Sequence, residues 1–418
     1  MTTQEKPAAL SHLKVLDLSR VLAGPWCTQM LADLGADVVK VERPGVGDDT
    51  RHWGPPFLQD AQARDTDQAT YFTSCNRNKR SITIDMAKPE GQALIRRMAA
   101  QSDIVVENFK VGGLKAYGLD YASLQALSPR LIYCSVTGFG QDGPYAERAG
   151  YDLMIQAMSG MMSITGKADG MPGGGPQRVG VALTDLFTGV YASTAILAAL
   201  EVRNRTGLGQ HIDMALLDVG MAILANQAAG FLNTTKVPQR QGNSHPSLAP
   251  YQDFPTADGA MLLAIGNDGQ FARFCDAAGH PEWAADPRYA SNSLRVQNRE
   301  TLIPALQSVT RTRSTAQWIT LLEDKAVPCG PINDMGQAFA DAQVQARGLV
   351  VKQALSPAES AQTAIESIAT VASPLRLTAT PPVLRRAPPG LGEHTDEVLE
   401  ELGLDALTIA SLRVGGVV

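Results

Sequence analysis

The sequence predicts an α/β protein with a large Rossmann-like domain, built on a parallel sheet, and a smaller α/β domain. Short runs of branched apolar residues alternate with segments whose apolar residues recur at helical spacing, and the length of 418 residues exceeds one simple core. The composition, with 44% hydrophobic and 19% charged residues and a net charge of -6, is that of an ordinary globular protein. It gives no reason to expect nucleic acid or an anionic membrane as a partner.

The first strand–helix–strand unit opens the chain. Residues 13–19 (LKVLDLS) and 36–42 (ADVVKVE) are predicted strands, and residues 20–35 are a predicted loop and helix. Pro25 suits the first helical turn, and Gly35 suits the left-handed position that closes a helix. The alternation then repeats, with further predicted strands at 80–86, 102–109 and 130–140 and helices at 89–101 and 121–126. Ligands of such sheets bind at the carboxyl ends of the strands.

Later segments predict a second domain. A helix is expected over 185–205, a strand that turns into a long helix over 210–232, and a polar connector over 233–259. A smaller α/β region follows, and in the C-terminal tail Thr395 is expected to cap a short helix. The predicted boundaries are residues 1–225 for a large domain completed by 345–418, 226–250 for a linker, and 251–344 for the small domain.

Several classes of protein are disfavoured. The apolar run 180–200 contains Asp185 and several hydroxyl side chains, which predicts a core helix and no membrane span. The first residues show no signal-peptide pattern, and five scattered cysteines without CxxC spacing favour a reducing, cytoplasmic compartment. The six histidines never recur at ligand spacing, so no metal site is predicted. The turn LAGPW lacks the GxGxxG of a dinucleotide site.

Basic residues lie in loops after the predicted strands or in turns beside them, where a parallel sheet places its ligand. They are Arg43, Arg77, Lys79, Arg80, Lys110, Lys115 and Arg148. Each is either a solvated surface charge or part of a site for a ligand with several phosphates. Asn108 and Phe109 are either a polar contact and a ring on which a nucleobase stacks, or a strand end with a core aromatic residue.

Asp185 is the candidate catalytic residue, because it lies among small and apolar residues where an unpaired carboxylate is costly. One interpretation is an N-cap of the helix that follows. The other is a carboxylate that the same helix end orients toward a ligand, with Gly180, Ala182 and Gly189 leaving room for a substrate. The two interpretations are compatible.

Together these segments resemble the family III CoA-transferases, the group of formyl-CoA, carnitine and related CoA-transferases, with α-methylacyl-CoA racemase as a cousin. The resemblance covers nearly the whole chain. It rests on segments in the family's order: VLDLSRVLAGPWCTQMLADLGADVVKVERPGVGDDTR, FTSCNRNKRSITIDM, IVVENFKVGGLKAYGL, RLIYCSVTGFGQDGPYAERAGYDLMIQAMSG, GVALTDLFTGVYASTAILAAL, VPCGPIN and LGEHTDEVL.

The resemblance implies a mechanism and a site. The family's catalytic aspartate falls on Asp185, which implies transfer of CoA between carboxylic acids through an aspartyl-CoA thioester, with CoA as a substrate and no tightly bound cofactor. The implied CoA contacts are Leu22, Ala23, Arg43, Asn76, Arg77, Asn78, Lys79, Arg80, Asn108, Phe109, Lys110, Tyr117, Arg148 and Tyr151. The family further implies an interlocked homodimer.

Two alternatives stay open at this stage. The racemase is expected to carry a histidine where this chain has Tyr151, and a neutral phenol is a poor base for α-proton exchange. A CoA-binding protein without catalytic activity would keep the basic loops but have no use for a nucleophile. The segment GNSHPSLAPYQDF resembles the branch that handles dicarboxylates such as glutarate and succinate, with Arg240, His245 and Ser247 near a distal carboxylate and succinyl-CoA as donor.

Overall fold

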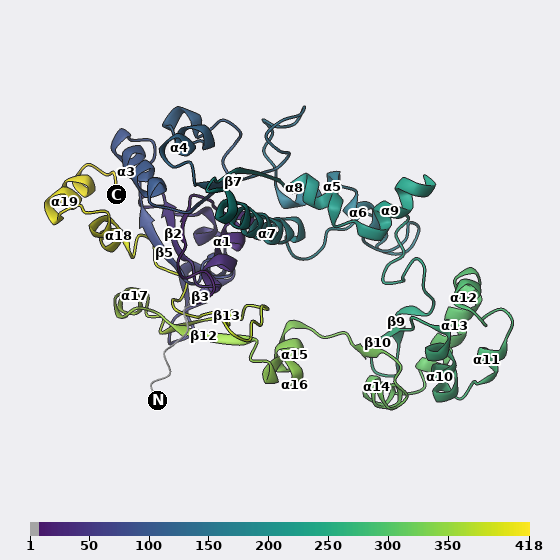
Figure 1. Ribbon diagram of the computed structural model, residues 1–418. Coiled ribbons are helices and arrows are strands. Elements are labelled where there is room, and N and C mark those ends of the chain that lie inside the picture. Colours follow the sequence, from purple (N-terminus) through teal and green to yellow (C-terminus); the bar gives the residue numbers. More distant parts are fainter. Residues whose placement is uncertain (1–7) are drawn as a thin grey trace. The chain divides into compact units, whose positions relative to one another are not determined.

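The computed structural model describes residues 8–418, apart from the side chains of residues 358 and 362. The start of the N-terminal stretch that lacks a signal-peptide pattern lies outside the described residues. The chain forms two compact units, each described by itself (Figure 1). Unit 1 comprises the described residues up to Ser159 together with Gly180–Ala225 and Gln345–Val418, and unit 2 comprises Gly160–Val179 and Asn226–Val344.

Unit 1 is built on a six-stranded sheet in the order β5-β2-β1-β6-β7-β8, in which every neighbouring pair is parallel. Its strands are β1 (Lys14–Asp17), β2 (Asp37–Glu42), β5 (Lys79–Thr83), β6 (Ile104–Glu107), β7 (Ile132–Thr137) and β8 (His211–Ala215). In the register, Val15 of β1 pairs with Val38 of β2 and Ile104 of β6. The predicted α/β class with a parallel sheet is confirmed.

The order of the strands reverses between β1 and β6. From β1 the chain adds β2 and β5 on one side, and it then returns to place β6, β7 and β8 on the other. Loops that leave two such neighbouring strands diverge in opposite directions and open a crevice at the carboxyl ends. The fold therefore places a ligand site beyond β1 and β6.

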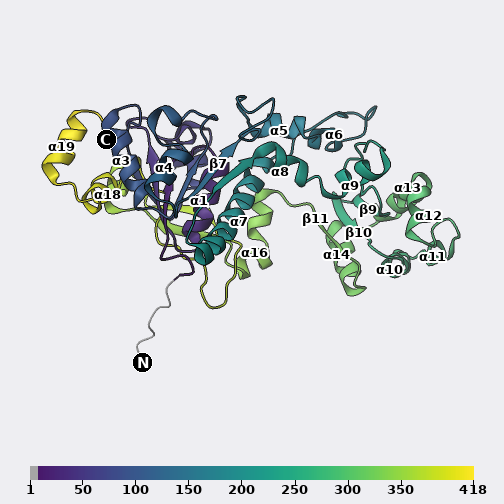
Figure 2. The ribbon, with the colours of Figure 1, turned by 45° about the horizontal axis from the view of Figure 1, so that its top comes forward.

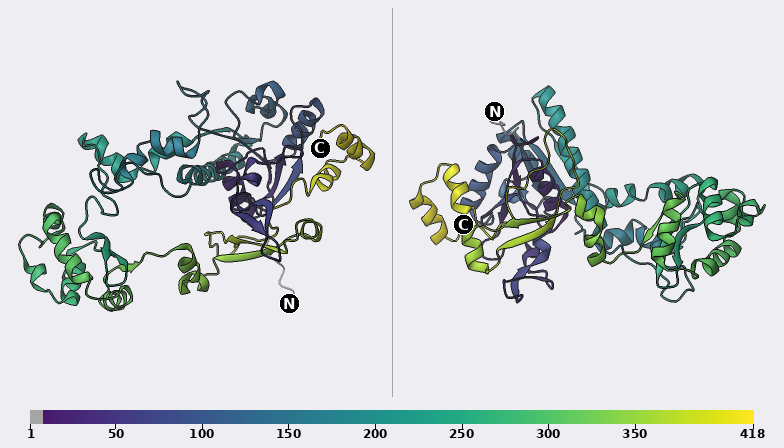
Figure 3. Two further views of the ribbon diagram at one scale, coloured as in Figure 1. Left: turned by 180° about the vertical axis from the view of Figure 1, so that it is seen from behind. Right: turned by 90° about the horizontal axis from the view of Figure 1, so that it is seen from below.

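Helices cover both faces of the sheet, because alternate strand residues point to opposite sides. Leu16 belongs to a core cluster with α3 (Pro89–Ala100), α4 (Tyr121–Leu127) and α18 (Thr395–Glu401). Val15 belongs to a second cluster with α1 (Ala23–Asp33) and α7 (Leu183–Thr206). Figure 3 shows the yellow C-terminal helices beside the blue α3. The C-terminal part of the chain thus completes the core of unit 1.

Helix α7 lies directly against α1 (Figure 2). A Cβ on Gly189 would lie 2.8 Å from the carbonyl oxygen of Ala23 and 2.9 Å from Cδ1 of Trp26, so only glycine permits this packing. By length and composition α7 is apolar enough to cross a membrane. Its Ala192 and Ile196 side chains are instead fully buried in the core, as the sequence predicts.

Three local predictions are wrong. In the segment 210–232 the predicted strand is β8, but the long helix predicted after it is two helices, α8 (Leu216–Ala222) and α9 (Ala225–Thr234), which are separate because Ala225 has a φ of 45°. Part of the predicted connector forms β9 (Tyr251–Pro255), which pairs with β10 (Ala260–Ala264). Thr395 does not cap α18: it is the first residue of that helix, and its hydroxyl accepts the N–H of Thr83 at 3.1 Å.

Unit 2 has an antiparallel sheet in the order β11-β10-β9, with β11 at Cys329–Pro331, and its core contains Trp318 and Phe274. Its helices are α6 (Met161–Ile164), α9, α10 (Asp268–Ala278), α11 (Glu282–Ala285), α12 (Asn292–Gln297), α13 (Arg299–Thr310), α14 (Thr315–Asp324) and α15 (Met335–Ala340). Residues 160–179, expected in the large domain, belong to unit 2, where the Gly242 N–H donates to the Gly166 carbonyl at 3.0 Å.

The remaining elements are short. They are η1 (Asp49–His52), β3 (Phe57–Gln59), β4 (Asp65–Ala69), α2 (Thr70–Thr73), η2 (Lys115–Tyr117), α5 (Asp152–Met158), α16 (Ala342–Ala346), β12 (Val350–Ala354), α17 (Pro357–Thr363), β13 (Ser367–Val371) and α19 (Ala406–Val414). Two of them, α2 and α5, bring side chains close to Asp185.

Candidate active site

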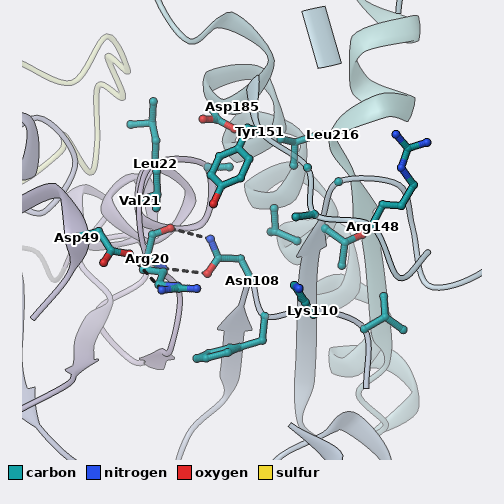
Figure 4. Close-up of a pocket in the computed structure, with 18 of the residues that line it drawn as sticks. Arg20, Val21, Leu22, Asp49, Asn108, Lys110, Arg148, Tyr151, Asp185 and Leu216 are labelled. Carbon is teal, nitrogen blue, oxygen red and sulfur yellow. Dashed lines mark hydrogen bonds and ion pairs between the residues drawn. The ribbon is translucent and has the colours of Figure 1, made fainter. Parts of the chain in front are cut away.

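A pocket of about 200 Å³ opens at the carboxyl ends of the strands in unit 1 (Figure 4). Its walls are the loop after β1 (20–23), the loop after β6 (108–111), the end of β7 (136–138) and the segment 146–151. Asp185 reaches it from the first turn of α7. The pocket thus lies where the strand order reverses, and seven of the residues implied by the resemblance line it beside Asp185: Leu22, Ala23, Asn108, Phe109, Lys110, Arg148 and Tyr151.

The Asp185 carboxylate has no hydrogen-bond partner within residues 8–418. Helix α7 begins at Leu183 with Ala182 as its N-cap, so the interpretation of Asp185 as an N-cap is wrong. The cap comes from Asp152, whose Oδ1 accepts the Thr184 N–H at 2.9 Å and the Thr184 hydroxyl at 2.6 Å. Burial, and then the charge of Asp152, raise the pKa of Asp185 to about 7.

The loop after β1 is held by several side chains. The Asn108 side-chain amide accepts the Arg20 N–H and donates to the Arg20 carbonyl. The Lys40 ammonium donates to the Ser19 carbonyl at 2.7 Å. The Asp48 carboxylate accepts the Val21 N–H at 3.2 Å, and Val21 has a φ of 72°. A β-branched residue keeps such a conformation only where its surroundings enforce it, and this strain is typical of functional loops.

The N-terminus of α1 offers donors to an anion. Its N-cap, Leu22, makes no side-chain cap, and the first N–H groups of a helix have no partner within the helix. Leu22 and Ala23 both line the pocket. Together with the positive end of the helix dipole, these groups suit a carboxylate, a phosphate or an oxyanion that forms during a reaction.

Two glycines let the walls of the pocket approach each other. A Cβ on Gly138 would lie 2.5 Å from the Cα of Gly150, and a Cβ on Gly150 would lie 2.2 Å from the Cα of Gly138. Both residues line the pocket, next to Tyr151. The chain therefore needs glycine at both positions to bring the segment 146–151 against the end of β7.

Cations surround the pocket. The Arg148 guanidinium lies 4.5 Å from the ring centroid of Tyr145, and Arg20 forms an ion pair with Asp49 at 3.1 Å. Arg43 is exposed and lines an adjoining pocket, which shares Phe109 with the first one. Phe109 also packs against the core, as the second interpretation of its ring expects, and stacking on a nucleobase stays a prediction. The two adjoining pockets are thus lined by cationic side chains and share an aromatic ring.

The predicted ligand residues 76–80 do not line this pocket. They are buried, and their side chains bind other parts of unit 1: Arg77 and Asn78 bind Asp33 at 2.9 and 2.8 Å, and Lys79 binds Asp17 at 3.0 Å and Asn76 at 2.8 Å. Arg80 pairs with Glu397 and Glu401 at 2.9 and 2.8 Å. Their positions indicate a structural role.

Three more predicted residues are not among those that line this pocket. Tyr117, in η2, packs against the core cluster of α3. Arg240 and His245 belong to unit 2. There Arg240 forms an ion pair with Asp169 and donates to the Ser163 carbonyl at 2.9 Å, and Nδ1 of His245 accepts the Ser247 N–H at 3.0 Å. Arg240 is thus already paired within unit 2.

Sequence reasoning missed an aromatic pair beside Asp185. Burial, and then the charge of Asp185, raise the pKa of Tyr71 to about 12, so the phenol and the carboxylate interact electrostatically. Tyr71 packs edge-on against Trp53, with ring centroids 5.4 Å apart, and Trp53 lines the pocket. Within residues 8–418 no cluster of three or more side chains could hold a metal ion.

Comparison with known proteins gives the family. The model of CoA-transferase family III matches residues 10–395, and the chain therefore belongs to this family. It is 51% identical over 393 residues to the succinate–glutarate CoA-transferase of Agrobacterium fabrum, which covers 94% of this chain and 95% of that protein. It is 43% identical over 410 residues to the succinyl-CoA:glutarate CoA-transferase of Mus musculus, covering 98% of this chain and 90% of that one.

A solved structure shows the same architecture. The crystal structure of a CAIB/BAIF family protein from Brucella suis matches with a TM-score of 0.82 at 48% identity. The match covers 95% of this chain and 100% of that one. The prediction of a family III CoA-transferase is confirmed, and the racemase and the non-catalytic binding protein are set aside.

Proposed function

We propose that this enzyme transfers CoA from succinyl-CoA to glutarate or a related dicarboxylic acid, through a covalent thioester on Asp185. One observation carries the assignment of the nucleophile. The Asp185 carboxylate lines the pocket beyond the parallel strands, and no described side chain or backbone group is bonded to it. The choice of acids rests on the relatives from Agrobacterium fabrum and Mus musculus, whose names give succinate or succinyl-CoA and glutarate.

The first half of the reaction loads the enzyme. An Asp185 oxygen attacks the thioester carbonyl of succinyl-CoA, the C–S bond breaks, and CoA leaves as a thiolate. This gives a mixed anhydride between Asp185 and succinate. The thiolate then attacks the Asp185 carbonyl, the C–O bond breaks, and succinate leaves, so the enzyme carries an aspartyl-CoA thioester.

The second half repeats these steps with the other acid. A carboxylate of glutarate attacks the aspartyl thioester and releases the CoA thiolate, which gives a second anhydride. The thiolate attacks the glutaryl carbonyl and restores the Asp185 carboxylate. One thioester replaces another, so the exchange needs no ATP. The N–H groups at the start of α1 are the proposed donors to the oxyanions that form.

The CoA itself is proposed to run along the carboxyl edge of the sheet. The pantetheine arm would lie in the pocket of Asp185, with its phosphates near Arg20, Lys110 and Arg148. The adjoining pocket, which Arg43 and Phe109 line, suits a nucleobase that stacks on a ring beside a cation. Residues 76–80 would support this edge from inside the protein and make no contact with CoA through their side chains.

A homodimer is part of the proposal. Helix α7 leaves a row of apolar side chains exposed, including Phe187 at 40%, Tyr191 at 44% and Leu197 at 39%. A continuous apolar face of this kind marks an interaction surface, and a second copy of the chain is the proposed partner. We further propose that the two units are functional domains, and that the enzyme works in the cytoplasm.

The test is a transfer assay on a panel of acids. Purified enzyme is incubated with succinyl-CoA and with glutarate, malonate, adipate, acetate or butyrate, and new acyl-CoA is followed by mass spectrometry. The proposal predicts transfer to dicarboxylates and none with Asp185→Ala, which should still bind CoA in calorimetry. Full transfer by Asp185→Ala would overturn the nucleophile, and equal rates with butyrate and glutarate would overturn the dicarboxylate preference.

A further inference from the structure

The helix that carries Asp185 is capped by a residue from another helix. A typical N-cap side chain belongs to the residue that precedes the helix, and here that residue is Ala182, which has no polar side-chain atom. Asp152, at the start of α5, supplies the acceptor instead. Its Oδ1 accepts the Thr184 N–H at 2.9 Å and the Thr184 hydroxyl at 2.6 Å.

The other oxygen of Asp152 is also fixed. Oδ2 accepts from the Gln156 amide at 2.8 Å, one turn further along α5. The same amide nitrogen lies 3.4 Å from the carbonyl oxygen of Val181, just before α7, and Gln156 is fully buried. Asp152 is therefore held by three donors to its two oxygens, and it ties the start of α5 to the start of α7.

The position of Asp152 concentrates charge near the nucleophile. It lies in the first turn of α5 and accepts from the first turn of α7, so the N-terminus of α7 faces its carboxylate, an arrangement that favours negative charge. The adjacent residue of α7 is Asp185, whose pKa Asp152 helps to raise. The Asp152 carboxylate is thus bonded to the start of α7, whereas the Asp185 carboxylate is unbonded and lines the pocket.

From this geometry we infer that Asp152 is a positioning residue for the transfer reaction: it caps α7 so that the Asp185 carboxylate stays unbonded in the pocket, and its negative charge makes that carboxylate a stronger nucleophile. The inference rests on the proposed role of Asp185. Without Asp152, the Thr184 N–H would lack an acceptor, and Asp185, in the same first turn, could bond to the free helix end and leave the pocket.

Other charged groups set the background for this effect. The charges of Asp185 and, more weakly, Asp48 act on Tyr71 of α2. Three cations line the same pocket: Arg20, Lys110 and Arg148. An asparagine removes the charge of Asp152 and still offers an acceptor oxygen to Thr184, and it gives up only the acceptor that Oδ2 presents to the Gln156 amide.

The experiment compares Asp152→Asn with Asp152→Ala in the succinyl-CoA transfer assay from pH 5 to 9. Asn keeps the cap and loses the charge, so the acid limb of kcat/KM should move down by about one pH unit, and kcat at the optimum should fall about three- to tenfold. Ala loses both, so it should show a larger loss of kcat and a lower Tm. Asp405→Asn, which alters the cap of α19 far along the chain, is the matched control and should leave the profile unchanged.

Each result separates this inference from the proposed function. An acid limb that stays in place in Asp152→Asn, with only the Tm lowered in Asp152→Ala, would show that Asp152 is a structural cap and overturn the inference. Asp185→Asn is assayed alongside. If that variant is inactive while the limb in Asp152→Asn does not move, the nucleophile stands and the inference falls. If Asp185→Asn transfers CoA normally, the proposed function falls first.

Discussion

The side-chain amide of Asn108 holds the backbone of Arg20 from both sides: Nδ2 donates to the Arg20 carbonyl at 2.7 Å, and Oδ1 accepts the Arg20 N–H at 3.0 Å. The two residues lie in the loops after β6 and β1, the strands between which the sheet order reverses. This pair of hydrogen bonds therefore fixes one wall of the pocket to the other (Figure 4). Residues of unit 1 can therefore be tested for whether they act in the pocket or support the protein around it.

Asn108→Ala should weaken substrate capture. Two hydrogen bonds of about 1 kcal/mol each would be lost, both to the backbone of the strained loop after β1, so kcat/KM should fall about tenfold or more. Most of the change should be in KM for succinyl-CoA, because the loop and not the nucleophile is released. Steady-state kinetics measure it, and an unchanged KM would show that the loop is held sufficiently by Lys40 and Asp48.

Gly138→Ala should distort the pocket wall. The added Cβ would lie 2.5 Å from the Cα of Gly150, which is backbone and can yield only if the segment 146–151 moves. We expect a loss of kcat/KM of at least tenfold and a destabilisation of about 1–3 kcal/mol. Gly230→Ala is the matched control, because nothing lies within 4 Å of a Cβ there. Thermal melts and kinetics measure both variants. If Gly138→Ala behaved like Gly230→Ala, the close packing of Gly138 against Gly150 would not be needed for the pocket.

Lys79→Met should affect stability. Lys79 and Asp17 have side chains with 0% exposure, and the substitution leaves the Asp17 carboxylate buried without its ammonium partner. Breaking a buried pair from one side costs about 3–5 kcal/mol, so the denaturation midpoint should fall strongly. Arg43→Ala is the counterpart: the residue is exposed, and its loss should raise KM for succinyl-CoA without changing the midpoint. If Lys79→Met raised KM and left the denaturation midpoint unchanged, Lys79 would be a binding residue and the structural role would be wrong.

Asp185→Asn should stabilise the protein at neutral and alkaline pH. The pKa of Asp185 in the folded state is raised to about 7, so the folded enzyme loses stability as the pH rises from the ordinary carboxyl range to that value. The amide does not ionise, and its advantage should grow from pH 4 to pH 7 and then stay constant. After discounting for solvent contact we expect about 1–2 kcal/mol. Urea midpoints of the variant and the wild type at pH 5 and pH 8 measure this difference in stability. An equal stabilisation at both pH values would be inconsistent with the raised pKa of Asp185.

The sheet and its ligand edge could be predicted because they depend on local pattern. Branched runs such as residues 13–19 and 36–42 are continuous in the sequence, and parallel sheets bury such strands on both faces. The placement of Asp185 also followed from its apolar neighbours. The cap of its helix did not, because Asp152 and Thr184 are 32 positions apart and no spacing rule connects them.

The basic residues show the same limit of local pattern. Lys79 and Arg80 are the first residues of β5, whereas Lys110 follows the carboxyl end of β6, and the basic side chains alone do not distinguish these two positions. Lys79 faces the buried Asp17, whereas Lys110 is exposed at the pocket. Tyr71 was missed for a related reason: it lies in a four-residue helix, α2, and its link to the pocket is a tertiary ring contact with Trp53.

The most direct test of the central claim is to capture CoA on Asp185. The enzyme is mixed with succinyl-CoA without an acceptor acid, quenched in acid, digested with trypsin, and analysed by mass spectrometry. The account predicts CoA attached by a thioester to the peptide 179–203, at Asp185 and not at Glu201, the peptide's other carboxylate. The adduct should disappear in Asp185→Ala and on addition of glutarate. CoA attached elsewhere, or an active enzyme that never carries CoA under these conditions, would contradict it.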